Sequence, residues 1–260
     1  MSRRHTDLRA IGRRVDLDLA VRCIELSRLA YRPPALGADI AKRVGYQHYA
    51  WLSRREQRDF SLVLTDGQYR YVVFRGTDQH LDWLTNLRLW RRTTPYGRVH
   101  RGYYDVALAF QKELTQQLAQ LPDLPTVFTG HSMGGALALL AALYQQEQGI
   151  NVRSIYTFGQ PQVGNKQFSA HVEEHIRAPY FRFVHGADAI AVWGMGQQAL
   201  LGSVCYFDLR GRLQFGRHLG GLPKLSLRLH RLEHYRFYLR LNRLKLRALE
   251  QGQDATMIPP

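Results

Sequence analysis

The chain has 260 residues, of which 45% are hydrophobic and 11% are aromatic. This composition is typical of a globular protein with a buried core and excludes a disordered chain. No apolar run approaches the roughly 18 residues that span a bilayer, so we expect no transmembrane helix. Lysine and arginine outnumber aspartate and glutamate by 36 to 21, and the resulting net charge of +15 favours an anionic partner.

The N-terminal stretch "MSRRHTDLRAIGRRVDLDLA" is basic but lacks the apolar segment and cleavage pattern of a secretory signal. We therefore expect a cytoplasmic or peripheral membrane protein, with non-classical secretion left open. Without such a signal, Cys23 and Cys205 are predicted to be buried, reduced thiols rather than a disulfide. No CxxC spacing is present, and we expect no metal site.

Hydropathy patterns predict the elements in chain order. Apolar residues at helical spacing predict an N-terminal helix over 17–31, which Pro33 and Pro34 end. Two β-rich runs around Asp66-Gly67 predict a hairpin. A charged, tryptophan-bearing linker then covers 78–98. The remaining predicted elements are helix 104–120, strand 126–130, helix 133–147, strand 153–159, helix 165–176, strand 180–188, a hairpin over 203–215 and a long C-terminal helix over 227–249.

Strands that alternate with helices in the middle of the chain predict βαβ units and a mostly parallel sheet. The sequence has no internal repeat and no low-complexity linker. We therefore expect residues 1–260 to form a single α/β domain.

The stretch "VFTGHSMGGALALL" carries the pattern G-x-S-x-G between a predicted strand and a predicted helix. Gly130 and Gly134 remove side chains that would clash at a tight turn, so that Ser132 can project above the sheet. The following helix points its free N–H groups toward the place where an oxyanion would develop. This context favours a nucleophilic serine. A phosphate-binding loop is disfavoured because no lysine follows the glycines.

A nucleophilic serine on this architecture needs an acid and a base, in the order Ser, Asp, His. Asp188 ends the predicted strand "YFRFVHGAD" and is the candidate acid. The candidate bases after it are His218, His230 and His234, and spacing alone does not choose between the last two. His131, beside the nucleophile, is interpreted as a packing or hydrogen-bonding residue.

The C-terminal segment concentrates the positive charge. Residues 209–249 contain eleven Lys or Arg and a single acid, Glu233. Arginines at spacings of 4, 3 and 4 predict a basic stripe on one face of the last helix: Arg236, Arg240, Arg243 and Arg247. The stripe is either a solvated face or a contact with an anionic membrane surface. We expect no nucleic-acid partner, because no recognition module is present.

Four ordered segments give the chain a resemblance to the class 3 lipases, the α/β-hydrolase group that includes the fungal triacylglycerol lipases. They are "VVFRGTDQHLDWLTNL", "VHRGYYDVA", "FTGHSMGGALALLAAL" and "YTFGQPQVGN", which together cover roughly residues 60–190. Met133 stands where the family usually has leucine, and Gln162 where it usually has arginine. The stretch after Asp188, "AIAVWGMG", lacks the family's proline.

The resemblance implies an α/β-hydrolase fold with helices on both faces of the sheet, and it implies roles for single residues. Ser132 would be the nucleophile and Asp188 the acid. "HRLEHY" matches the family's C-terminal motif and favours His230 as the base. Thr77 and the Met133 N–H would hold the oxyanion. His100 and Asp105 are interpreted as structural residues near the site.

Residues 78–98 fall where fungal members carry a lid. The tryptophan and leucine side chains of this stretch, Trp83, Leu87 and Trp90, either pack on the core or form an amphipathic flap.

These observations predict a serine hydrolase that cleaves carboxylic esters of lipids, as a triacylglycerol lipase or a phospholipase A1-like enzyme, without a metal or organic cofactor. Two alternatives stay open. One is a soluble carboxylesterase for small or aromatic esters. The other is a catalytically inactive lipid-surface binding protein, which would use the basic C-terminal helix. The retained Ser, Asp, His and Thr set argues against the second alternative.

Overall fold

The computed structural model describes residues 7–54, 57–77, 91–186, 188–192, 201–216, 226–255 and 258. Within them, one mixed sheet runs through the molecule in the order β1-β2-β3-β6-β7-β8-β9-β10. Its strands are β1 (His48–Arg54), β2 (Gln57–Thr65), β3 (Arg70–Phe74), β6 (Thr126–His131), β7 (Val152–Phe158), β8 (Tyr180–His185), β9 (Ser203–Phe207) and β10 (Leu213–Phe215). The five strands from β3 to β9 pair in parallel, and antiparallel hairpins flank them at both edges.

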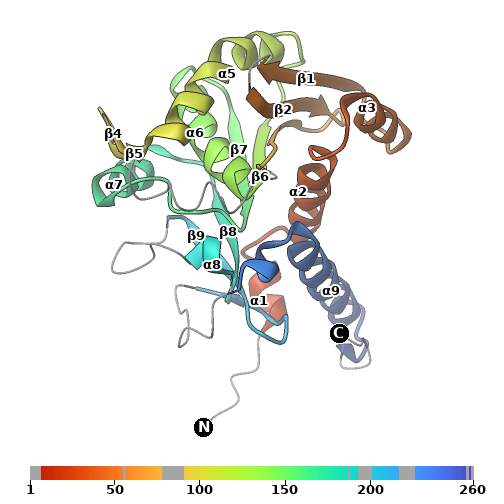
Figure 1. Cartoon of the computed structure of the whole chain (residues 1–260). Coiled ribbons are helices and arrows are strands. Elements are labelled where there is room, and N and C mark those ends of the chain that lie inside the picture. Colours follow the sequence, from red (N-terminus) through yellow and green to blue (C-terminus); the bar gives the residue numbers. More distant parts are fainter. Residues whose placement is uncertain are drawn as a thin grey trace.

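Helices cover both faces of this sheet, as the sequence predicted (Figure 1). On one face lie α5 (Arg101–Ala119), α6 (Met133–Glu147) and α7 (Lys166–His175). On the other lie α1 (Leu8–Gly12), α2 (Leu17–Leu29) and α9 (Leu232–Glu250). The period-two alternation of β3 divides its side chains between the two cores: Val72 and Phe74 pack with α5 and α6, and Tyr71 and Val73 with α2.

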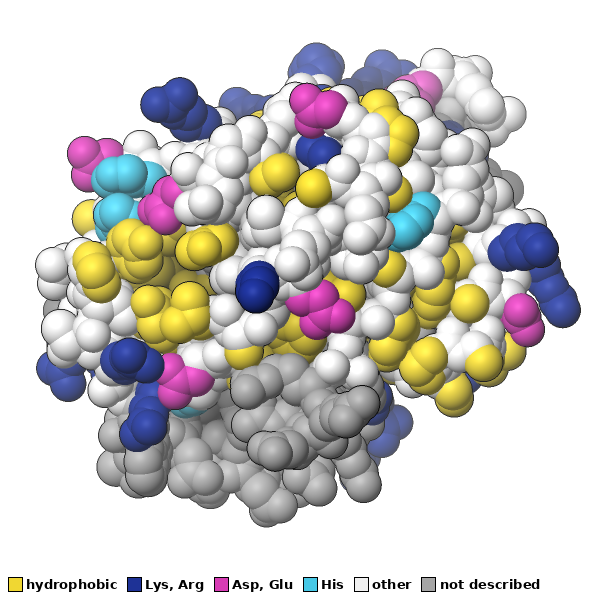
Figure 2. Space-filling model, turned by 90° about the horizontal axis from the view of Figure 1, so that it is seen from above, with side chains coloured by type: hydrophobic (Ala, Val, Ile, Leu, Met, Phe, Trp, Pro, Cys, Tyr) yellow, Lys and Arg dark blue, Asp and Glu magenta, His cyan; other side chains and the backbone are white. Residues whose placement is uncertain are grey.

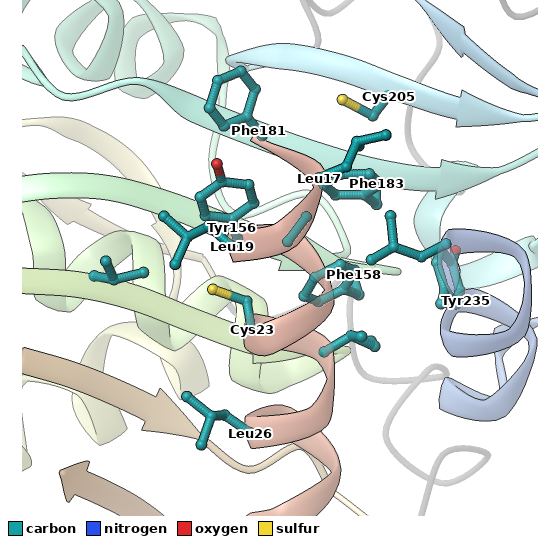
Figure 3. Close-up of a cluster of buried hydrophobic side chains, with 14 of the residues drawn as sticks. Leu17, Leu19, Cys23, Leu26, Tyr156, Phe158, Phe181, Phe183, Cys205 and Tyr235 are labelled. Carbon is teal, nitrogen blue, oxygen red and sulfur yellow. The ribbon is translucent and has the colours of Figure 1, made fainter. Parts of the chain in front are cut away.

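The buried face of α2 seats this helix on the sheet. Leu17 and Leu19 lie beside aromatic side chains of β7 and β8, Tyr156 and Phe183, and Cys23 and Leu26 continue the same buried cluster further along the helix (Figure 3). Asp16 caps the helix by accepting a hydrogen bond from the Leu19 N–H at 2.9 Å. Cys23 and Cys205 are both free and fully buried, as predicted, and burial raises the pKa of each thiol.

Three elements before the first predicted hairpin were missed from the sequence: α1, a further helix and a strand. Pro33 and Pro34 do end α2, but Pro34 also starts a new helix, α3 (Pro34–Arg43). Proline suits the first helical position because the N–H that it lacks would have no partner there. Strand β1 then pairs with β2 and extends the predicted hairpin to three strands, with His48 opposite Thr65.

Part of the predicted linker over 78–98 is regular structure. The strands β4 (Arg91–Thr94) and β5 (Gly97–His100) form a separate antiparallel hairpin, in which Gly97 adopts a φ of +116° at the turn. Because only glycine adopts such a φ readily, Gly97 fits this turn.

The predicted C-terminal helix over 227–249 is in fact two elements. Residues Leu227–His230 form a 3₁₀ turn, η1, and α9 begins only at Leu232. Between them Arg231 is extended, with φ −60° and ψ 133°. This break lets the chain change direction directly after His230, which continuous helical geometry would forbid.

The arginine stripe of α9 faces α2, which lies beside it in Figure 1. Arg236 and Arg240 contact Glu25, at 2.7 and 3.2 Å, and Arg243 and Arg247 contact Asp18. The stripe is therefore largely paired within the protein rather than fully solvated, although the Arg240 and Arg247 side chains remain 53% and 56% exposed. In the described part of the chain, no helix has the length and apolar character needed to cross a membrane.

Candidate active site

Ser132 occupies the sharp turn between β6 and α6. Its backbone has φ 58° and ψ −130°. Among the described residues, Ser132 is the one residue other than glycine that has a positive φ. Such a conformation costs about 1–3 kcal/mol and persists only where the surroundings enforce it. The Ser132 N–H donates to the Phe158 carbonyl at 2.9 Å, which ties the turn to the neighbouring strand β7.

The two outer glycines of G-x-S-x-G let the backbone close up around Ser132. A Cβ on Gly130 would overlap the backbone of Gly134, and a Cβ on Gly134 would overlap the carbonyl of Phe74. A side chain at either position would push the start of α6 away from the sheet. The predicted reason for these glycines is therefore confirmed.

Helix α6 begins at Met133, directly after the serine, and spans 15 residues. Its N-terminus faces the turn, so free N–H groups and the positive end of the helix dipole lie next to Ser132. Met133 is buried and its backbone N–H belongs to this first turn. This position suits an oxyanion donor, the role that the resemblance implies.

The structure brings Asp188 and His230 together. His230 Nδ1 lies 2.8 Å from Asp188 Oδ2, and both side chains are buried. Gly159 lies between this pair and the serine turn. It directly follows Phe158, whose carbonyl accepts the hydrogen bond from the Ser132 N–H. A Cβ on Gly159 would lie 3.1 Å from both Asp188 Oδ2 and the imidazole of His230. The glycine thus leaves room for the imidazole beside the end of β7.

Asp188 follows β8 at the carboxyl edge of the parallel strands, where Ser132 also emerges. An isolated parallel bridge between Asp188 and Ser226 brings the η1 segment, and with it His230, alongside. The other carboxylate oxygen, Oδ1, accepts hydrogen bonds from the backbone N–H groups of Ile190 and Ala191 in α8 (Ala189–Val192), at 2.8 and 3.1 Å. The first turn of α8 therefore fixes the carboxylate.

Burial raises the pKa of Asp188, but the opposing interactions are stronger in sum, and the pKa lies below its usual value. These are the charge and hydrogen bond of His230, the hydroxyl of Tyr235 and the Ala191 N–H. The carboxylate is therefore ionised at neutral pH, as an acid that stabilises an imidazolium must be.

Three supporting residues escaped the sequence reasoning. Tyr235 donates its hydroxyl proton to Asp188 Oδ2 at 2.5 Å, and it is the last letter of "HRLEHY", so the motif carried the signal. Tyr31 hydrogen-bonds His131 Nδ1 at 3.0 Å, and no sequence pattern indicated it. Arg182, buried in β8, donates to the carbonyls of Gln160 and Ala191 and joins the loop after β7 to α8.

His131 is a hydrogen-bonding residue, as predicted. Its Nε2 lies 2.8 Å from the His230 carbonyl oxygen, and the two imidazole rings pack with centroids 4.8 Å apart. With Tyr31 on its other nitrogen, His131 holds the backbone of His230 against the serine turn. His234 lies one turn further along, in α9, and is partly exposed.

The segment "FRGT" runs along the serine turn. A Cβ on Gly76 would lie 2.7 Å from the His131 carbonyl oxygen and 3.2 Å from Ser132 Cβ. Gly76 therefore lies against the serine turn, and Thr77 is the next residue in the chain. Its assignment as the second oxyanion donor remains a prediction that this placement supports.

The other predicted residues fall outside the site or outside the described residues. His100 caps α5 by accepting from the Tyr103 N–H, and Asp105 pairs with Arg92 and Arg101, so both are structural. The predicted lid residues, Trp83, Leu87 and Trp90, and the candidate base His218 lie outside the described residues.

One pair of histidines on α7 was overlooked in the sequence. His171 and His175 are four residues apart, and their rings stack at 3.9 Å. Within the described residues, no group of three His, Cys, Asp or Glu side chains is arranged to hold a metal ion. We therefore assign this pair no metal.

Known proteins are similar to this chain in sequence and in fold. The lipase (class 3) family model matches residues 71–194. The chain is 37% identical over 131 residues to a lipase of Rhizomucor miehei, and 32% identical over 137 residues to a secreted mono- and diacylglycerol lipase of Fusarium solani. These stretches cover 46% and 49% of this chain, but only 36% and 40% of the two relatives, so the chain matches well under half of their length.

Solved structures agree over a longer stretch. The triacylglyceride lipase of Rhizomucor miehei superposes with a TM-score of 0.64 at 27% identity, over 74% of this chain and 80% of that one. A triacylglycerol lipase whose catalytic centre is formed by a serine protease triad superposes with a TM-score of 0.65 at 27% identity, over 76% and 83%. The fold is that of an α/β-hydrolase. More narrowly, residues 71–194 are similar to the class 3 lipases.

Proposed function

We propose that the protein is a serine hydrolase that cleaves carboxylic esters of lipids. The observation that carries this proposal is the buried His230–Asp188 pair beside the strained turn of Ser132. A dead scaffold needs neither an ionised carboxylate held at 2.8 Å from an imidazole nor a serine kept at positive φ. The lipases among the relatives support an acylglycerol as the substrate.

The mechanism has two acyl transfers. His230 Nε2 takes the hydroxyl proton of Ser132 while Oγ attacks the ester carbonyl, and Asp188 stabilises the resulting imidazolium. The Met133 N–H and Thr77 hold the oxyanion of the tetrahedral intermediate. The imidazolium then gives its proton to the leaving alcohol. Water, deprotonated by the same imidazole, attacks the acyl-enzyme, and the carboxylic acid leaves as Ser132 regains its proton.

Hydrolysis of p-nitrophenyl esters of increasing chain length tests this function. We expect Ser132→Ala to lower kcat by about 10⁴-fold or more. Equal activity in the variant would overturn the mechanism. Preference for the shortest esters, without stimulation by emulsified lipid, would favour a soluble carboxylesterase. Lipid binding without any hydrolysis would favour an inactive lipid-surface binding protein.

The choice of base has its own matched pair of variants. We expect His230→Ala to abolish turnover and His234→Ala to retain it, because His230 contacts Asp188. The opposite pattern would assign the base to His234. The unfolding midpoint of each variant, measured in urea, shows whether either protein has lost its fold.

A further inference from the structure

A groove of about 570 Å³ is lined by residues of α2, α3, the segment after α3 and α9. Its floor is apolar and comes from α2, α3 and the turn that follows α3: Val21, Leu26, Leu29, Leu36, Ile40 and Val44. Its charged lining residues are four arginines and one carboxylate: Arg22, Arg28, Arg32, Arg240 and Glu25. Grooves of about 300–1,000 Å³ with an apolar floor and a few polar groups are typical of small-molecule sites.

The floor includes side chains that water reaches. Leu36 is 46% exposed and Val44 is 66% exposed, although both are large hydrophobic residues. Seen from above, hydrophobic side chains gather at both the left and the right of the molecule, and the right-hand group lies on the side on which α3 lies in Figure 1 (Figure 2). Exposed apolar surface next to a hollow favours a ligand with an apolar part.

The charges of the groove are unequal at its two ends. At the Val44 end, Arg22 is neutralised by Asp66 and also donates to the Tyr71 hydroxyl at 2.9 Å. At the Leu36 end, Arg32 is exposed and makes no ion pair with any described residue. Arg28 stands nearby and shares its partners Glu25 and Glu233 with Arg236. The Leu36 end therefore carries the excess positive charge.

The lining residues of the groove are spread along α2 from Val21 to Leu29. Gly37 of α3 lies close to Leu29, and Tyr46 beyond α3 packs on Tyr71, the partner of Arg22. The groove thus follows α2 from Val21 to Leu29, or about 12 Å at 1.5 Å per residue. A single extended chain fits this shape.

We propose that the groove binds a fatty acid. Its carboxylate would lie at Arg32, with Arg28 beside it, and its alkyl chain would run along the floor toward Val44. A guanidinium binds a planar carboxylate through two parallel N–H···O bonds. No lining residue belongs to the candidate active site, so this second site stands apart from the proposed ester hydrolysis.

Isothermal titration of the full chain with octanoate, decanoate and dodecanoate tests the proposal. We expect each added methylene to tighten binding about fourfold until the floor is filled. Arg32→Gln should weaken dodecanoate at least fivefold. Arg43→Gln, an exposed arginine of α3 that does not line the groove, is the matched control and should bind as the wild type does. Both variants should hydrolyse esters at the wild-type rate.

Photolabelling shows where the fatty acid lies. A diazirine-bearing dodecanoate should label peptides from residues 21–46, and Leu36→Gln should reduce that label. Label confined to peptides around Ser132 and His230 would overturn the proposal, as would equal binding of dodecyltrimethylammonium. A dimer that dissociates in Leu36→Gln but ignores dodecanoate would assign the groove to a second copy of the chain instead.

Discussion

The hydroxyl of Tyr235 and the imidazole of His230 share one oxygen of Asp188. Tyr235 donates to Oδ2 at 2.5 Å, and His230 Nδ1 lies 2.8 Å from the same atom. The Tyr235 oxygen in turn accepts from the His185 N–H at 3.1 Å. Burial, with the nearby carboxylate, raises the pKa of Tyr235 well above its usual value, so the phenol stays a donor throughout the working range of the protein.

Tyr235→Phe removes this donor without removing the ring. We expect the free energy of unfolding to fall by about 1.5–3 kcal/mol, the range for hydrogen bonds to charged groups. We expect kcat for ester hydrolysis to fall about tenfold, because Asp188 is then held by fewer partners. Urea unfolding and steady-state kinetics measure the two effects. Phe237→Leu, at an exposed position of the same helix, is the control.

Asp188 makes stability depend on pH. Its pKa in the folded state lies below its ordinary value of 3.8. The ionised group therefore stabilises the protein above that value, and the contribution is lost as the pH falls through the folded-state pKa. We expect the stability difference between the wild type and Asp188→Asn to be largest near neutral pH and to shrink below about pH 4. A difference that grows in acid would contradict the assignment of an ionised Asp188.

The positive φ of Ser132 lowers the stability of the folded protein. Ser132→Gly should raise the free energy of unfolding by about 1 kcal/mol or more, because glycine adopts the φ of 58° without strain. Ser132→Ala keeps a Cβ and should leave stability within about 0.5 kcal/mol of the wild type. Both variants should lack activity. If urea unfolding finds the two equally stable, the turn is unstrained.

Gly134→Ala should be severely destabilising. The added methyl overlaps the Phe74 carbonyl, so α6 must shift away from β3. We expect a loss of about 1–3 kcal/mol, the usual cost of overpacking, together with loss of activity. Ala138→Gly, at a buried position in the middle of the same helix, is the control and should cost about 1–2 kcal/mol through lower helix propensity and the loss of a buried methyl group. Activity in that control should remain.

The ion pairs between α2 and α9 differ in burial, and so should their energies. The Arg243 side chain is 13% exposed and contacts Asp18 and Glu250, whereas the Arg240 side chain is 53% exposed. Exposed pairs contribute about 0–1 kcal/mol. We expect Arg240→Ala to change stability by less than about 0.5 kcal/mol and Arg243→Ala to lower it by more. Equal effects in urea unfolding would show that burial of this network is unimportant.

Much of the fold could be read from the sequence because its signals are local. At the serine turn, Gly130 and Gly134 stand where a side chain would overlap the backbone. The hairpin around Asp66 has the expected turn residue, Gly67 at φ +82°. Strand β1 and helix α3 were missed for different reasons. Strand β1 depends on pairing with β2, and Pro34 can either follow a helix or start one.

The site was harder to predict, because its geometry depends on contacts between distant segments. The pairing of Asp188 with His230 rather than His234 depends on the extended backbone of Arg231, which no local pattern indicated. Tyr31 lies 100 residues from His131 in the chain, and the arginine stripe is matched by acids more than 200 residues away. Sequence spacing indicated the right residue types, and three-dimensional packing determined their partners.

Ser132 and His230 are far apart in the chain, so the ribosome adds them at different times. During synthesis Ser132 and Asp188 are added to the chain before His230, which follows Asp188 by 42 residues. Until α9 emerges, Asp18 and Glu25 also lack the arginines that they contact in the finished protein. On the proposed mechanism, the nascent protein carries the nucleophile without its base until α9 packs against α2.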